Sequence, residues 1–257
     1  MFTRLHLPDV TLVAVTSVDI DQTNTALLHS AGQIDFGAVK LLCSAMPTTM
    51  DSRVKYVPIP PVDFVGYSRF MIESLSAYIQ TSHCLVIQSD GFVLDAARWH
   101  HRFLEYDYIG APWPEVVSMT VPGGWSSLKL DKNLVGNGGF SLRSKRLLDA
   151  TSRLRFDSLN FPSKSEDLLI CHFLYNDMRA LGIRFAPPEI AALFSIEINS
   201  GQYGQSFDSV FGFHGKLWLR EAWKRIGSKV QPGEIRRNQA CPCRSGRKYK
   251  HCCGAYR

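Results

Sequence analysis

The sequence predicts an α/β protein in which a Rossmann-like, mostly parallel sheet fills residues 1–230 and a small module fills residues 231–257. Short apolar segments rich in β-branched residues alternate with amphipathic segments over the first ninety residues, which is the pattern of parallel strands joined by crossover helices. With 257 residues, the chain can bury the core of one large domain and still carry an appendage. Four of the seven cysteines lie beyond a polar linker, so we place the boundary near Gln231.

The N-terminal elements follow in order along the chain. Continuous apolar runs of strand length predict strands, whereas apolar positions at helical spacing predict helices. The predicted strands are residues 11–19, 39–45, 55–57 and 83–88, and the predicted helices are residues 21–32 and 66–81.

The second half of the body is less regular. Residues 115–133 contain Gly123 and Gly124 and are predicted to be a long loop, of the kind that often serves as a lid or binding segment. The further predicted elements are strands at 140–142 and 184–186, helices at 144–152 and 166–182, and an irregular aromatic segment at 191–215.

The composition describes a globular protein with a basic C-terminal tail. The first apolar run, residues 11–18, has only the length of a strand, so we expect neither a signal peptide nor a membrane span, and a cytoplasmic location. The net charge of +6 lies in residues 220–257, which carry eleven lysines and arginines against two glutamates, so the body is near neutral or slightly acidic. Such a tail can contact protein, ribosome or nucleic-acid partners through its electrostatic field, and the alternative is a solvated surface.

Two polar residues are candidate ligands of a divalent cation. Asp90 follows the predicted strand 83–88 and precedes Gly91, and ligands of open parallel sheets lie beyond the carboxyl ends of strands. A carboxylate there can hold Mn²⁺ or Mg²⁺ against a substrate phosphate, and the imidazole of His214 can complete the site. The alternatives are an ordinary Asp-Gly turn and a packed histidine.

The segment Gly136, Asn137, Gly138 and Gly139 is a candidate ligand-binding loop. Glycines permit positive φ and let a backbone approach a ligand closely. The alternative is a hairpin, because Asn-Gly is a favoured two-residue turn. The sequence matches neither the Walker loop nor the glycine spacing of dinucleotide-binding proteins.

Glu166 and Asp167 open the predicted helix 166–182. A carboxylate at this place can act as the general base that deprotonates an acceptor hydroxyl. Acidic residues also suit the first turn of a helix that Ser163 or Ser165 caps, so the pair has a purely structural alternative.

Taken in chain order, Asp90, the glycine loop, the pair at 166–167 and His214 resemble the core of glycosyltransferases of the A-type fold. The resemblance implies a glycosyltransferase-A-type sheet, with Asp90 and His214 holding the cation on the donor diphosphate. It implies that the glycine loop borders donor and acceptor, and that Asp167, helped or replaced by Glu166, is the base.

More closely, residues from about 7 to 214 resemble an uncharacterised bacterial family of glycosyltransferase-like domains. The similar stretches are residues 10–17, 67–70, 88–91, 106–113, 136–143 and 194–195. One departure is Gln88, which stands where the usual acidic pair has its first aspartate. Asp107 and Trp113 lie in these stretches and are candidates for contact with donor or acceptor, because carboxylates accept bonds from sugar hydroxyls and indole rings stack on sugars. Their alternative role is core packing.

The tail carries four cysteines at zinc-ligand spacing: Cys241, Cys243, Cys252 and Cys253. They resemble the SEC-C motif at the end of the SecA translocase, in which the last ligand is sometimes histidine, so His251 is a competitor for the last position. Four protein ligands make such a zinc structural, and the metal would supply the folding free energy of so small a module, on the order of 10 kcal/mol.

These observations predict an enzyme that transfers a sugar from a nucleotide-sugar donor to a hydroxyl of a glycan or other acceptor, with a zinc module that docks partners. Two alternatives remain. Gln88 favours a degenerate protein that binds a glycan or nucleotide without turnover, and the basic tail favours an adaptor that acts through its zinc module.

Overall fold

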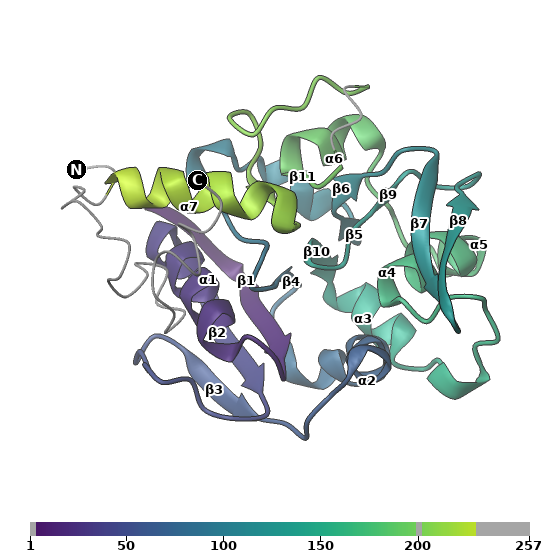
Figure 1. Cartoon of the computed structure of the whole chain (residues 1–257), viewed down its shortest axis with the longest axis horizontal. Helices are drawn as coiled ribbons and strands as arrows, with labels where there is room; N and C mark the ends of the chain where they lie inside the picture. Colours follow the sequence, from purple (N-terminus) through teal and green to yellow (C-terminus); the bar gives the residue numbers. More distant parts are fainter. Residues whose placement is uncertain (1–3, 199–201, 230–257) are drawn as a thin grey trace.

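The computed structural model describes residues 4–198 and 202–229, and at its centre lies a six-stranded sheet with the order β3-β2-β1-β4-β10-β5 (Figure 1). These strands are β1 (Leu5–Thr16), β2 (Ile34–Cys43), β3 (Lys55–Pro58), β4 (His83–Ile87), β5 (Tyr108–Ile109) and β10 (Phe140–Ser144). The first four run parallel, whereas β10 is antiparallel to both β4 and β5. The predicted α/β fold with a mainly parallel sheet is confirmed.

The helices cover the sheet or extend from its edges. They are α1 (Ile20–Gln33), α2 (Phe64–Arg69), α3 (Lys145–Thr151), α4 (Glu166–Leu168), α5 (Tyr175–Ala180), α6 (Pro188–Phe194) and α7 (Lys216–Lys229), with short 3₁₀ turns at Ala96–Arg98, His101–Glu105 and Phe156–Ser158. The predicted helix 66–81 is observed as α2 continued by a π-helical turn (Phe70–Ser74) and a 3₁₀ turn (Leu75–Tyr78). The predicted helix 166–182 is likewise divided by a π-helical turn (Leu169–Phe173). In the described part of the chain, no helix combines the length and apolar character that crossing a membrane requires.

The central strands are apolar throughout because both faces of the sheet are covered. Leu12 of β1 packs in the cluster that contains Leu27 of α1. Its neighbour Val13 points to the opposite face and packs with Met71 and Leu75 of the helical segment after β3. This two-sided burial explains why these strands appear in the sequence as continuous apolar runs.

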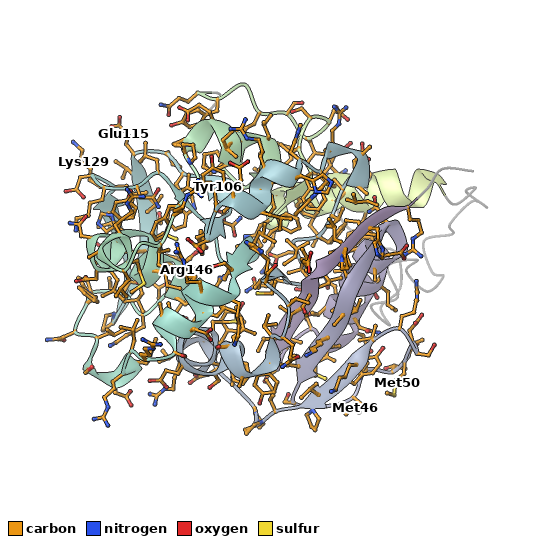
Figure 2. The ribbon with its side chains drawn as sticks, turned by 180° about the vertical axis from the view of Figure 1, so that it is seen from behind. Met46, Met50, Tyr106, Glu115, Lys129 and Arg146 are labelled. Carbon is orange, nitrogen blue, oxygen red and sulfur yellow. The ribbon has the colours of Figure 1, made fainter. Side chains whose placement is uncertain are left out.

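The prediction of a long loop at residues 115–133 is wrong, because most of this segment forms an antiparallel hairpin of β7 (Val116–Val121) and β8 (Gly124–Lys129). Its turn is Pro122-Gly123, and Gly123 and the first residue of β8, Gly124, have φ of 89° and 154°, a region that other residues rarely adopt. Figure 2 shows the base of the hairpin, at Glu115 and Lys129, on the opposite side of the molecule from Met46 and Met50 of the β2–β3 loop.

The segment 191–215 is more regular than predicted. It contains the end of α6 and a parallel pair of short strands, β11 (Ser195–Ile196) and β12 (Gly212–Phe213). A further pair joins β6 (Ala111–Pro112) to β9 (Val135–Gly136). The predicted strand 184–186 is reduced to a single bridge between Tyr108 and Phe185.

The chain leaves β1 toward β2 on one side and later returns to β4 on the other side. The carboxyl ends of β1 and β4 therefore flank a topological switch point, which is where open α/β sheets bind ligands.

Gly110 joins β5 to β6 with its Cα against the backbone of β9. A Cβ on this residue would lie 1.7 Å from the carbonyl oxygen of Gly136, which cannot move without breaking the β6–β9 pair. We expect Gly110→Ala to lower the free energy of unfolding by about 1–3 kcal/mol or more, measured by urea denaturation. The matched control is Gly32→Ala in α1, where a Cβ meets nothing within 4 Å. That change should raise stability by up to about 1 kcal/mol, and equal effects of the two changes would contradict the prediction.

Candidate active site

A cleft of about 390 Å³ opens at this switch point. Residues 15–18 at the end of β1 and residues 88–89 after β4 form one part of its lining. The opposite part comes from residues 62–64 at the start of α2 and from the glycine loop. Ser165, Glu166, Asp167, Tyr67, Thr23 and His214 complete the lining. Segments that are far apart in the sequence thus converge on one hollow.

His214 is the most highly connected polar side chain of the cleft. Its Nε2 lies 3.4 Å from Oδ1 of Asp90 and 3.2 Å from Oε1 of Gln88, and its Nδ1 lies 3.0 Å from Oε1 of Glu197. Burial lowers the pKa of the imidazole, but hydrogen bonds and charge from Asp90 and Glu197 outweigh it and raise the pKa to about 10. Without a cation, His214 therefore carries one positive charge, which offsets part of the negative charge of Asp90 and Glu197.

Backbone hydrogen bonds bring Asp90 and His214 together. His214 follows β12 and donates its amide N–H to the carbonyl of Ile196, and Gly215 donates to the carbonyl of Asp90. Gln88 and Gly91 exchange two backbone bonds, so the Asp-Gly turn considered as an alternative does form, and it carries Asp90 toward the imidazole. Burial raises the pKa of Asp90, but the hydrogen bond and charge of His214 lower it overall. Asp90 and Gly91 border the cleft without lining it.

The glycine loop is shaped by close approach and not by positive φ. A Cβ on Gly139 would lie 2.1 Å from Nε2 of His214, and one on Gly138 would lie 2.0 Å from Oε1 of Glu166. The loop residue with positive φ is Asn137, at 69°, and its Oδ1 accepts the N–H of Gly139 at 2.9 Å. The hairpin alternative is wrong, because β9 pairs with β6 whereas β10 pairs with β4 and β5.

Glu166 is committed to a buried ion pair. Nη2 of Arg143 lies 2.8 Å from its Oε1, and the exposed fractions of the two side chains are 0% and 7%. Arg143 also donates from Nε to Ser141, and its guanidinium lies 5.3 Å above the ring of Tyr108. Glu166 therefore neutralises a buried charge, and among the described residues no lysine, arginine or histidine forms an ion pair with Asp167.

Asp167 is held by backbone donors. Gly138 donates to Oδ2 at 3.1 Å, and Leu168 donates to Oδ1 at 2.8 Å. Ser165 occupies the position before the helix, but its side chain makes no capping bond. Burial, followed by the charges of Glu166 and Glu197, raises the pKa of Asp167 to about 7. A carboxylate with such a pKa can take up and release a proton near neutral pH.

The structure does not bring Asp107 and Trp113 to the lining of the cleft. Asp107 accepts hydrogen bonds from Ser144, from Arg146 (labelled in Figure 2) and from the amide of Arg184. It therefore connects the start of β5 to α3 and to the segment between α5 and α6. Trp113 packs its ring against Gly136 and donates Nε1–H to Oε2 of Glu197 at 2.9 Å. Trp113 thus reaches the site through Glu197.

Metal ligands are present as a pair and not as a complete set. Within residues 4–198 and 202–229, no three His, Cys, Asp or Glu side chains are grouped so that they could hold a metal ion. Asp90 and His214 offer one oxygen and one nitrogen, so an ion between them would take its other ligands from a bound substrate or water. The zinc candidates Cys241, Cys243, Cys252 and Cys253, together with the proposed boundary at 230/231, lie outside the described residues.

Sequence analysis missed Glu197 and Arg143. Glu197 directly follows the short strand β11, just as Asp90 follows β4, and an acid at the end of a strand was the one available signal. Arg143 lies in β10, whose residues are all buried, and a buried charged residue needs a partner.

The buried ion pair predicts a large effect of mutation. Glu166→Ala leaves the guanidinium of Arg143 buried without a carboxylate, so we expect the free energy of unfolding to fall by about 3–5 kcal/mol in urea denaturation. The control is Asp157→Ala, which removes the partner of Arg69 from a pair with exposed fractions of 44% and 75%. That change should cost at most about 1 kcal/mol, and a similar loss in both variants would contradict the assignment.

The raised pKa of Asp167 predicts how stability depends on pH. Between the pKa of an unfolded aspartate, about 3.9, and the folded value of about 7, Asp167 binds more protons in the folded protein than in the unfolded chain. Stability must therefore fall as pH rises through this window. We expect the free energy of unfolding to fall less steeply in Asp167→Asn than in the wild type.

Asp107→Asn is the control for this pH series. Burial raises the pKa of Asp107, but hydrogen bonds from Arg146 and Ser144 lower it overall, so its contribution is lost only below about pH 4. The slope above that pH should be unchanged in this variant. Equal slopes in the wild type and Asp167→Asn would contradict the shift assigned to Asp167.

Comparisons with known proteins give short or distant similarities. A segment of 27 residues is 59% identical to the protein translocase subunit SecA of Dichelobacter nodosus, and a segment of 39 residues is 54% identical to a UPF0225 protein of Serratia proteamaculans. These segments make up 10% and 15% of the chain and span only 3% and 23% of the two relatives.

Among solved structures, the chain is similar to the galactosyltransferase LgtC in complex with donor and acceptor sugar analogues. The superposition covers 88% of this chain and 99% of LgtC, with 10% sequence identity and a TM-score of 0.47. A glycosyltransferase involved in glycosylating the major capsid of PBCV-1 covers 85% and 98%, with 14% identity and a TM-score of 0.43. The apo form of the glycosyltransferase GlyE of Streptococcus pneumoniae covers 86% and 60%, with 12% identity and a TM-score of 0.44.

Two family models match the chain. The SEC-C motif matches residues 237–255, which confirms the resemblance of the tail. The model described as "Protein of unknown function (DUF5672)" matches residues 53–214, well over half of the chain, and so confirms the resemblance of the body to an uncharacterised family. The protein therefore belongs to the DUF5672 family and carries a SEC-C motif after its family domain.

Proposed function

We propose that the protein is a glycosyltransferase that moves a sugar from a nucleotide-sugar donor to a hydroxyl of an acceptor. The observation that carries the proposal is the arrangement of one cleft at the switch point of the sheet. His214, with Asp90 beside it, and Asp167, with its pKa of about 7, face the same cleft. Cation ligands and a proton acceptor at one cleft large enough for a nucleotide are what transfer from a nucleotide sugar requires.

The donor would lie along the carboxyl end of β1. Val15 and Val18 offer apolar surface, and Thr16 and Ser17 offer hydroxyl groups, which suits a nucleoside. Among the described lining residues none is lysine or arginine, so a diphosphate needs another positive charge. Nε2 of His214 and Oδ1 of Asp90, 3.4 Å apart, can ligate one ion at about 2.0–2.2 Å each. A bound Mn²⁺ or Mg²⁺ would neutralise the diphosphate and its leaving charge.

Asp167 would serve as the general base. Its carboxylate takes the proton of the acceptor hydroxyl as the acceptor oxygen forms a bond to the anomeric carbon of the sugar. The bond from that carbon to the phosphate oxygen breaks, and the nucleoside diphosphate leaves with the electron pair. Gly138, by donating to Oδ2, fixes the carboxylate, while Glu166 remains paired with Arg143 and acts by holding the loop.

A second candidate function is binding of a nucleotide or glycan without transfer. Gln88 favours it, because this residue supplies an amide where a second carboxylate would strengthen cation binding. Its Nε2 donates to the hydroxyl of Tyr67 at 2.9 Å, so the amide is held in place.

For the tail, we propose that Cys241, Cys243, Cys252 and Cys253 bind a structural Zn²⁺ and that the basic module docks a protein or nucleic-acid partner. The match to the SEC-C motif supports the first part, and the concentration of lysine and arginine after residue 220 supports the second.

A thermal-shift screen of the full chain against nucleotide sugars, with and without Mn²⁺, tests the transferase proposal. One donor class should raise Tm in the presence of Mn²⁺, and Asp90→Ala or His214→Ala should abolish the rise. Asp167→Asn should keep the rise but slow sugar transfer by about 10²–10⁴-fold. The control is Asp95→Ala, an exposed aspartate paired with Arg98, which should change neither readout.

The outcomes separate the candidates. A rise in Tm without transfer to any acceptor would favour the binding protein, and transfer that persists in Asp167→Asn would exclude Asp167 as the base. No response to any nucleotide sugar would contradict the transferase and leave binding of a glycan as the remaining candidate.

A further inference from the structure

We propose that Glu197 is a positioning residue that, held by Trp113, makes His214 present Nε2 to the cation site. The inference rests on the role proposed above for His214. Glu197 follows β11, and its carboxylate lies between two side chains from distant parts of the chain. Oε1 lies 3.0 Å from Nδ1 of His214, and Oε2 accepts Nε1–H of Trp113 at 2.9 Å.

The glutamate itself is anchored from a third direction. Its backbone carbonyl accepts Nε1–H of Trp218 at 2.7 Å. Trp218 lies in α7, and its ring stacks on Phe207 with 5.3 Å between ring centroids and 12° between ring planes. Two indole groups from separate elements thus fix both the main chain and the side chain of one acidic residue.

The arrangement determines which ring nitrogen can exchange its proton for a cation. A carboxylate only accepts, so the nitrogen that faces it must carry a proton. Nδ1 of His214 therefore carries a proton, and without a cation Nε2, which faces Asp90 and Gln88, carries one too. A cation at Nε2 takes the place of the second proton, while Glu197 keeps the first on Nδ1. Carboxylates placed in this way behind metal-binding histidines orient the ring and strengthen its ligation.

Trp113 makes the proposal testable, because an indole can only donate. In Glu197→Gln the single amide oxygen is drawn to Trp113, so the amide NH₂ must face Nδ1. Nδ1 then becomes an acceptor, and in the neutral imidazole the proton moves to Nε2, where it blocks a cation. Glu197→Gln in a Trp113→Phe background lets the amide turn over, so that its oxygen can again accept from Nδ1.

The experiment measures Mn²⁺ binding to the full chain by the EPR signal of free Mn²⁺, with His214→Ala defining binding elsewhere. We expect Glu197→Gln to weaken the His214-dependent site by about 10–100-fold. The double variant Glu197→Gln/Trp113→Phe should recover most of that loss. The matched control Glu189→Gln, at an exposed glutamate of α6, should bind as the wild type does.

A second readout follows the imidazole itself by NMR of ¹⁵N-histidine-labelled protein without Mn²⁺. The wild type should show a slowly exchanging proton on Nδ1 of His214, and Glu197→Gln should lose it. If Glu197 only filled space, the double variant would bind Mn²⁺ more weakly than Glu197→Gln, which would overturn the proposal. If His214→Ala binds Mn²⁺ as well as the wild type, the cation role fails, and a Nδ1 proton that survives in Glu197→Gln would separately overturn the role of Glu197.

Discussion

Arg143 has no exposed surface, although a guanidinium is always charged, so the cost of removing it from water must be offset inside the protein. Glu166 supplies the opposite charge, Ser141 accepts from Nε, and the ring of Tyr108 lies below the guanidinium. The pair joins β10 to the start of α4. Because Gly138 lies directly against Glu166, the pair also fixes the glycine loop, and through the amide of Gly138 it fixes Asp167.

The parts of the fold that could be predicted are those buried on both sides. β1 and β4 have long apolar runs because helices cover both faces of the sheet, and such runs are distinct in a single sequence. The β7–β8 hairpin was missed because only one of its faces packs on the core, with Val117 and Met119 inward and Trp125 exposed. The alternation of apolar and polar residues in this hairpin is weak and adjoins two glycines, so in the sequence alone the segment resembles a loop.

Site residues could be predicted where the neighbouring sequence indicates their role, and not where their role depends on contacts with distant residues. Asp90, the glycine loop, Asp167 and His214 each follow a strand or open a helix, and the structure places them around one cleft or at its border. The role of Glu197 becomes apparent only from its contacts with Trp113 and His214 in the folded structure. Asp107 was expected near the ligand, yet its bonds to Ser144 and Arg146 occupy it in the scaffold.

The position of β10 has a consequence for how the chain must be made. β4 ends at Ile87, but the strand that covers its second edge does not begin until Phe140. A chain that is cut short before Phe140, or still emerging from the ribosome, exposes the edge of an apolar strand that is already paired with β1 on its other side. Such an edge is a template for strands of other chains, so truncated or slowly synthesised copies of this protein are prone to aggregate through β4.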